Sequence, residues 1–170
     1  MERCPVTKPL VLVTCALLLP VNILAQEPVV HVRPAQLEGS RPLEKQTESS
    51  VLRDYLESWK SMEQALDQNQ AAKLDPDFIG VARDKLAETI DEQNRIGIHT
   101  RYQDRSHDLQ IVFYSPEGLS IQMTDTVEYE QQIVEKDKVL ASKTIRLRYV
   151  VVLTPSEVRW QVRILQAESN

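Results

Sequence analysis

The spacing of apolar residues changes abruptly at Gly97, and this change constrains the fold more than any other feature of the chain. Before Gly97, apolar residues recur at intervals of three and four, which places them on one face of a helix. After Gly97 they recur at every second position, which is typical of strands with one buried face. The sequence therefore predicts an α+β domain in which two helices precede a sheet.

The first predicted helix begins at Ser49 or Ser50, because Ser is a favourable N-cap residue, and it ends near residue 72. Lys60, Glu63 and Gln64 are expected to face water. The apolar face consists of Val51, Leu52, Tyr55, Leu56, Trp59, Met62 and Leu66.

The second predicted helix begins at Asp75-Pro76, since Asp is a good N-cap residue and Pro suits the first helical position. Gly97 is expected to end it as a C-cap glycine. Gly80 lies inside this pattern, where it either costs about 1 kcal/mol relative to Ala or allows close approach of another element. The apolar face consists of Phe78, Val81, Ala82, Leu86 and Ile90.

The remainder of the chain is divided into about five strands by turns expected at residues 104–106, 115–118, 135–138 and 154–157. Charged residues alternate with the apolar ones, so one face of the sheet is expected to be covered and the other to face water. The predicted fold is two N-terminal helices packed on a curved antiparallel sheet of about five strands. The inward-facing side chains are expected to be Ile98, Thr100, Tyr102, Leu109, Ile111, Phe113, Leu119, Ile121, Met123, Val127, Tyr129, Ile133, Ile145, Leu147, Tyr149, Val151, Leu153, Val158, Trp160, Val162 and Ile164.

Residues 1–25 have the layout of a secretory signal peptide. Arg3 and Lys8 precede an apolar run over residues 10–25, and a polar segment follows Ala25. The run is shorter than the about 20 apolar residues that a transmembrane helix needs. We expect cleavage after Ala25 and an exported protein, periplasmic or secreted. An uncleaved membrane anchor is the alternative, and only then is membrane contact expected.

Residues 26–49 are predicted to form a disordered linker, because they contain three prolines and no lasting periodicity. The folded domain is expected to span residues 50–168. A mature chain of about 145 residues is long enough to bury one core without disulfides.

Composition excludes several classes of function. Both cysteines, Cys4 and Cys15, lie in the leader, so the mature chain has no thiol for catalysis, zinc or iron–sulfur clusters. The 25 acidic and 20 basic residues are interspersed, which argues against nucleic-acid binding. With four glycines and no Gly-x-Ser-x-Gly pattern, neither a phosphate loop nor a serine nucleophile is indicated. No cofactor is expected.

The order of elements resembles the nuclear-transport-factor-2-like superfamily, a cone-shaped α+β fold shared with SnoaL-like domains. The resemblance covers residues 50–167 and is carried by Trp59 in the first helix and by the closing strand with Trp160-Gln161-Val162. The usual third helix has no room within residues 115–118. The absence of this helix weakens the inference that the chain is an enzyme like the enzymatic members of the superfamily.

Within that superfamily the chain is most similar to the IMS-type domains of plastid-division and related bacterial proteins. Their first helix carries a Trp-Lys pair, as in Trp59-Lys60, and a Gly and an aromatic residue occur near the first strands, as Gly97 and Tyr102 do here. This resemblance implies a membrane-tethered scaffold domain as one functional alternative.

Asp125 is the candidate catalytic residue. It continues the odd register of Met123 and Val127, which points its carboxylate towards the covered face. Buried carboxylates are costly unless paired and often mark functional sites, so Asp125 could act as a general base or anchor a ligand. We favour the simpler interpretation, a bulge near residues 124–126 that leaves Asp125 in solvent.

The histidines support weaker hypotheses. His99 and Asp108 could form an acid–base pair, although His99 lies on the register expected to be exposed. His107 and Asp108 beside Asp104 could suggest a metal. However, neighbouring strand residues point to opposite faces and no further ligand follows at a diagnostic spacing, so no metal site is predicted.

If the cone is hollow, a ligand pocket is expected to be lined by Tyr55, Trp59, Tyr102, Asp125, Tyr149 and Trp160. The alternative is that these aromatic side chains fill the core. We expect an exported, non-catalytic binding or interaction module for a small apolar ligand or a protein partner, with long strands that could form a homodimer. A SnoaL-like enzyme performing proton transfer or hydrolysis, with Asp125 as its base, remains an alternative.

Overall fold

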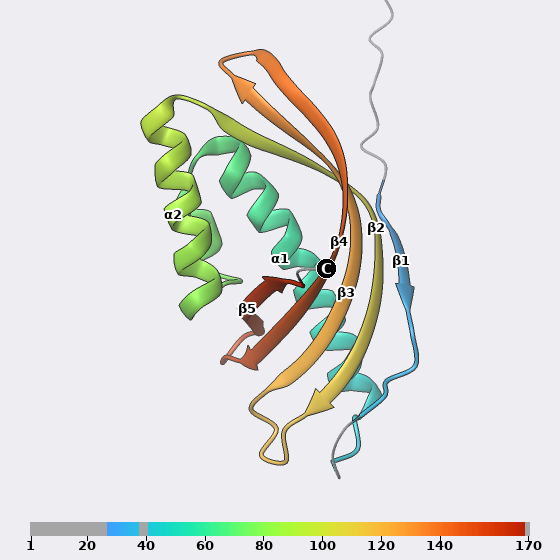
Figure 1. Cartoon of the computed structure of the whole chain (residues 1–170). Coiled ribbons are helices and arrows are strands. Elements are labelled where there is room, and N and C mark those ends of the chain that lie inside the picture. Colours follow the sequence, from blue (N-terminus) through green and yellow to red (C-terminus); the bar gives the residue numbers. More distant parts are fainter. Residues whose placement is uncertain (1–26, 38–40, 169–170) are drawn as a thin grey trace, which may run out of the picture.

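The computed structural model describes residues 27–37 and 41–168, and Figure 1 shows both helices on the concave side of one curved sheet. The sheet has the order β1-β2-β3-β4-β5. The α+β class is confirmed, and the predicted leader lies outside the described residues. The elements are β1 (Val29–Val32), α1 (Lys45–Gln68), the 3-10 helix η1 (Ala71–Leu74), α2 (Gly80–Ile96), β2 (His99–Tyr114), β3 (Ile121–Glu135), β4 (Lys138–Pro155) and β5 (Trp160–Ala167).

Helix α1 buries the predicted apolar stripe against the sheet. It begins at Lys45 with Glu44 as N-cap and no side-chain capping bond, so Ser49 and Ser50 lie inside the helix rather than at its start. Packing of the apolar face therefore outweighs the local capping preference. The stripe residues that are fully buried are Val51, Tyr55, Trp59, Met62 and Leu66.

Helix α2 begins at Gly80 rather than at Asp75, which corrects the prediction from the Asp-Pro pair. The preceding segment lies alongside β5, where Phe78 forms an isolated parallel bridge with Val162. Gly80 then adopts a φ of +53°, a conformation that glycine tolerates best. Gly97, at a φ of +75°, is confirmed as the C-cap.

The sheet is mixed rather than antiparallel, because β1 pairs with β2 in parallel. The expected disordered linker is therefore wrong for Val29–Val32 and for the first turn of α1. The segment Val-Val-His-Val has high strand propensity, and β2 offers it an edge. The attachment is reinforced where Arg33 contacts Asp108 at 2.9 Å.

Strand β2 is continuous, so the turn predicted at residues 104–106 is wrong. A bulge occurs there instead, where Asp104 pairs with Tyr129 and Ser106 pairs with Glu128. The extra residue reverses the inward register, and Asp104 and His107 therefore face the same side of the sheet. The fifth strand is β1, and the other three predicted turns are confirmed.

The core lies between the helices and the concave face of the sheet and largely follows the predicted inward register. Leu119 and Val158 are exceptions, because both lie in turns and are 63% and 81% exposed. Phe113 is a third exception, because a register shift between Ile111 and Phe113 buries Tyr114 in its place. No helix within the described ranges is long and apolar enough to span a membrane.

Candidate functional site

Asp125 lies at the centre of the sheet, opposite Leu109 of β2 and Tyr149 of β4. The pairing on both sides is regular around it, so the bulge that we favoured near residues 124–126 is not formed. The side chain is fully buried. The odd register of β3 therefore continues through Asp125, and its carboxylate points into the domain.

A chain of hydrogen bonds runs through this carboxylate. The Tyr55 hydroxyl donates to Asp125 Oδ2 at 2.8 Å, and His107 Nδ1 contacts the same oxygen at 2.6 Å. The other ring nitrogen, His107 Nε2, lies 2.8 Å from Asp104 Oδ2. The imidazole is thus held at both nitrogens by carboxylates from two strands, and we call Tyr55, Asp104, His107 and Asp125 the buried acid–base network.

The electrostatics of this network favour a protonated imidazole. Burial opposes the charged form of His107, but its hydrogen bonds to Asp104 and Asp125 and the charges of these two residues outweigh that cost and raise its pKa to about 9. Burial, together with the charge of Asp125, raises the pKa of the Tyr55 hydroxyl well above its usual range. At neutral pH, His107 is therefore a cation that donates to both acids.

Glu63 of α1 is the second titratable group near the network. Burial and the charge of Asp104 raise the pKa of Glu63 to about 7. The Glu63 side chain is half-buried, with Oε1 shielded from solvent, so the prediction that it faces water is wrong. It follows Trp59 by one helical turn, and that i, i+4 relation to a core residue was the signal that could have identified it.

Aromatic side chains fill the space around the network. Trp59 packs on His107 with ring centroids 5.1 Å apart, and it also contacts Tyr129 and Tyr149 at 6.0 and 5.9 Å. Tyr55 and Trp59 are 0% and 2% exposed. Tyr55, Trp59 and Tyr149, which were predicted to line a central pocket, therefore lie in a packed aromatic cluster.

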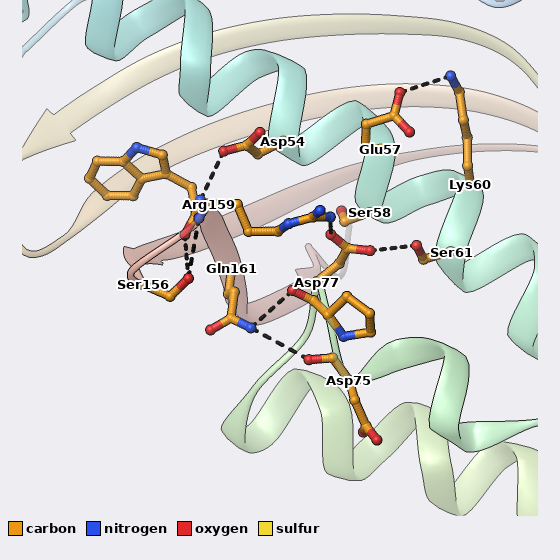
Figure 2. A network of polar contacts seen from close by, with 12 residues as sticks. Asp54, Glu57, Ser58, Lys60, Ser61, Asp75, Asp77, Ser156, Arg159 and Gln161 are labelled. Atoms are coloured by element: carbon orange, nitrogen blue, oxygen red, sulfur yellow. Dashed lines mark hydrogen bonds and ion pairs between the residues drawn. The ribbon is translucent and has the colours of Figure 1, made fainter.

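Trp160 does not join this aromatic cluster. Its backbone N–H donates to Asp54 Oδ2 at 2.9 Å, at the start of β5. In the same region Arg159 Nη1 donates to Asp77 Oδ1 at 2.6 Å, and Ser61 donates to Asp77 Oδ2 at 2.5 Å (Figure 2). These contacts join α1, the segment before α2, and β5, so we interpret them as structural.

A pocket of about 360 Å³ lies at the edge of the sheet beside α1. We call it the α1–β2 pocket. Of the predicted pocket residues, only Tyr102 lines it. Glu63 and Asp104 are also in its wall, so the pocket adjoins the buried acid–base network. The full lining is Glu27, Pro28, Val30, Arg53, Leu56, Glu57, Lys60, Glu63, Tyr102, Gln103 and Asp104.

The structure supports neither the proposed His99–Asp108 pair nor a metal site at the histidines. His99 Nε2 lies 3.6 Å from Asp67, whereas Asp108 contacts Arg33, so His99 and Asp108 are not brought together. Among the described residues, no group of three or more His, Cys, Asp or Glu side chains is arranged to hold a metal ion.

Sequence reasoning missed His107 as a member of the site. His107 lies two residues before Leu109 and four before Ile111, in the same inward register, and this signal was present in the sequence. The contact with Asp104 could not be found in that way. It depends on the bulge, because residues three apart in a regular strand point to opposite faces.

Neither a scan against protein-family models nor a search of curated proteins finds a match to this sequence. Solved structures do show similarity. The intermembrane-space region of the chloroplast protein ARC6 superposes with a TM-score of 0.61 at 12% identity, covering 76% of this chain and 100% of that one. A protein from Novosphingobium aromaticivorans that is named as a scytalone dehydratase gives a TM-score of 0.51 at 14% identity, covering 74% and 89%. At such identities the likeness concerns the α+β fold alone.

Proposed function

We propose that the protein is a non-catalytic binding module that takes a small, mainly apolar ligand in the α1–β2 pocket. The observation that carries this proposal is the packed interior. Trp59 and Tyr55 occupy the space where a substrate would meet Asp125, and His107 has no exposed surface. A group that no ligand can reach is poorly suited to proton transfer with a substrate.

The chemistry of the pocket suggests what it would bind. Pro28, Val30, Leu56 and Tyr102 supply apolar surface, and ligand sites typically combine such surface with a few polar groups. Two basic side chains of the lining are already paired, Lys60 with Glu57 and Arg53 with Asp54.

Carboxyl groups outnumber basic groups in the wall of the pocket. Glu27, Glu57, Glu63 and Asp104 line it, against Arg53 and Lys60. A ligand with an apolar body and a hydrogen-bond donor or an amine would therefore complement this wall better than an anion.

Isothermal titration calorimetry can measure the affinity of the protein for 4-phenylbutylamine, 4-phenylbutanol and 4-phenylbutanoate. We expect the amine and the alcohol to bind more tightly than the carboxylate. Val30→Trp should fill the pocket and weaken binding by about tenfold or more. Val32→Trp is the matched control, because Val32 is exposed on the same strand and does not line the pocket. Equal affinity in both variants would contradict the proposal.

A second candidate function is proton-transfer catalysis, as expected for a SnoaL-like enzyme, with Glu63 rather than Asp125 as the base. The specific observation in its favour is that Glu63 lines the pocket and has a pKa of about 7, near the value that general acid–base catalysis favours. Deuterium incorporation into a panel of small ketones would test it. Exchange that is catalysed by the parent and lost in Glu63→Gln would support the enzyme; no exchange would favour the binding module.

The cellular location also remains a proposal. The layout of residues 1–25 supports export. The similarity in fold to the intermembrane-space region of the chloroplast protein ARC6 is compatible with a tethered domain. Sequencing the N-terminus of the protein recovered from cells distinguishes the two, since a start at Gln26 supports a free exported domain and an intact leader supports a membrane anchor.

A further inference from the structure

Strand β4 is much longer than the strand that covers its outer edge. β4 spans Lys138–Pro155, whereas β5 pairs only with Tyr149–Pro155. On that side, residues 138–147 have no strand neighbour in the described part of the chain. Figure 1 shows this part of the β3–β4 hairpin projecting well away from β5, and residues 138–144 are all exposed.

The orientation of the free backbone groups follows from one hydrogen bond. The N–H of Glu168 donates to the carbonyl of Arg148 at 2.8 Å, so the backbone groups of Arg148 point towards the β5 side. Orientation alternates along a strand, and β4 pairs regularly with β3 from Ala141 onwards. The N–H and C=O groups of Ser142, Thr144 and Arg146 therefore point towards the free edge.

This edge is positively charged. Between Lys138 and Pro155 there are four basic residues and no acidic one. Arg148 pairs with Glu168 at 3.2 Å, while Lys138, Lys143 and Arg146 form no ion pair with the residues that the structure describes. On the neighbouring strand, Glu128 lies opposite Arg146, and Glu130 already contacts Arg105.

We propose that the free edge of β4, from Ser142 to Arg146, binds an extended acidic segment of a partner protein as an added strand. Unpaired edges are templates for strand addition, and charge complementarity selects the partner. Self-pairing of two copies is disfavoured, because it would gather the basic residues of both strands along one seam without an acidic residue of β4 to offset them. The exposed Val139 and Leu140 provide apolar surface beside this edge.

Three blocked eight-residue peptides test the chemistry. One alternates Val and Glu, the second alternates Val and Lys, and the third repeats the first with an N-methyl group on every backbone amide, so that neither edge of it can donate a hydrogen bond. We expect the Val-Glu peptide to bind, and both others to bind at least about tenfold more weakly. If the methylated peptide binds as well as the first, the attraction is only electrostatic and strand addition is wrong.

Amide hydrogen exchange measured by NMR locates the binding. The amides of Ser142, Thr144 and Arg146 should gain protection on addition of the Val-Glu peptide, while those of Lys143 and Ile145, which face β3, should change little. Protection elsewhere, or none, would overturn the proposal.

Two substitutions at one position provide a matched pair. Thr144→Pro removes an N–H that faces the free edge, which an edge strand tolerates, whereas Thr144→Val keeps it. We expect Thr144→Pro to lose peptide binding and Thr144→Val to retain it. Lys143→Glu should reduce the preference for the acidic peptide. Equal binding by both Thr144 variants would also overturn the proposal.

The α1–β2 pocket plays no part in this test, so Val30→Trp should leave peptide binding unchanged.

Discussion

His107 and Glu63 hold protons more tightly in the folded protein than in the unfolded chain, for different reasons. His107 is a cation between two carboxylates, whose attraction outweighs the cost of burial and gives a pKa of about 9. Burial first, and then the neighbouring charge of Asp104, disfavours the ionised form of Glu63 and gives a pKa of about 7. Each group therefore makes folding depend on pH in the same direction.

The expected result is a stability that decreases as pH rises from about 4.5 to 9. The contribution of His107 is fully present below its unfolded pKa of 6.5 and is lost as pH rises through about 9, a change of about 3 kcal/mol. Glu63 remains protonated in the folded protein between 4.5 and about 7 while the unfolded chain ionises, which lowers stability by up to about 3 kcal/mol over that range. Urea unfolding at pH 5, 7 and 9 measures both effects.

Glu63→Gln and His107→Gln separate the two contributions. The first should flatten the profile between pH 4.5 and 7, and the second should flatten it between 6.5 and 9. If His107→Gln does not fold, an NMR titration of the parent imidazole gives the same information. An imidazole that is neutral at pH 7.5 would contradict the assigned cation.

The inward position of Asp125 could be predicted from its register, but its partners could not. Period-two spacing fixes which face a strand residue occupies. It does not indicate which side chain of a distant helix lies above it, as Tyr55 does, nor does it reveal a bulge. The favoured bulge near residues 124–126 was introduced to avoid burying a carboxylate, whereas the structure buries it and pairs one of its oxygens, Oδ2, with Tyr55 and His107.

At the scale of elements, Asp77 links α1 to the residue that precedes β5. This carboxylate is 2% exposed and accepts hydrogen bonds from Ser61 on α1 and from Arg159 at the start of β5 (Figure 2). It follows η1, in the segment that the sequence assigned to a helix. Helix existence was predictable from spacing, but this helix start was not, because contacts with β5 determine it.

Asp77→Asn should lower the free energy of unfolding by about 1–3 kcal/mol, because a charged acceptor is replaced by a neutral amide in a buried position. Arg159 is 38% exposed and can be hydrated in the variant, which limits the loss. Asp75→Asn is the control, since Asp75 is 54% exposed and its contact with Arg83 is at the surface; it should cost less than about 1 kcal/mol. Equal effects of the two substitutions in urea unfolding would show that Asp77 does not join these elements.

At the scale of the whole molecule, the sequence predicted the α+β class and the helices ahead of the sheet, but not the location of the α1–β2 pocket. The pocket was predicted between the helices and the concave face of the sheet, where Trp59 packs with Tyr129 and Tyr149. The α1–β2 pocket instead needs residues from β1, which composition had assigned to a linker. Composition could not show that a short apolar segment gains strand partners from a distant edge.

Removal of residues 1–33 should therefore separate binding from stability. All four residues of β1 are exposed, so their loss should change the free energy of unfolding by about 1 kcal/mol or less. The same truncation removes Glu27, Pro28 and Val30 from the wall of the α1–β2 pocket, and binding of 4-phenylbutylamine should fall by about tenfold or more.

His31→Ala is the control, because His31 lies on β1 and does not line the pocket. Calorimetry and urea unfolding of the same samples measure both quantities. Unchanged amine binding by the truncated protein would place the ligand elsewhere, whereas a large loss of stability would mean that β1 belongs to the folding unit rather than only to the pocket wall.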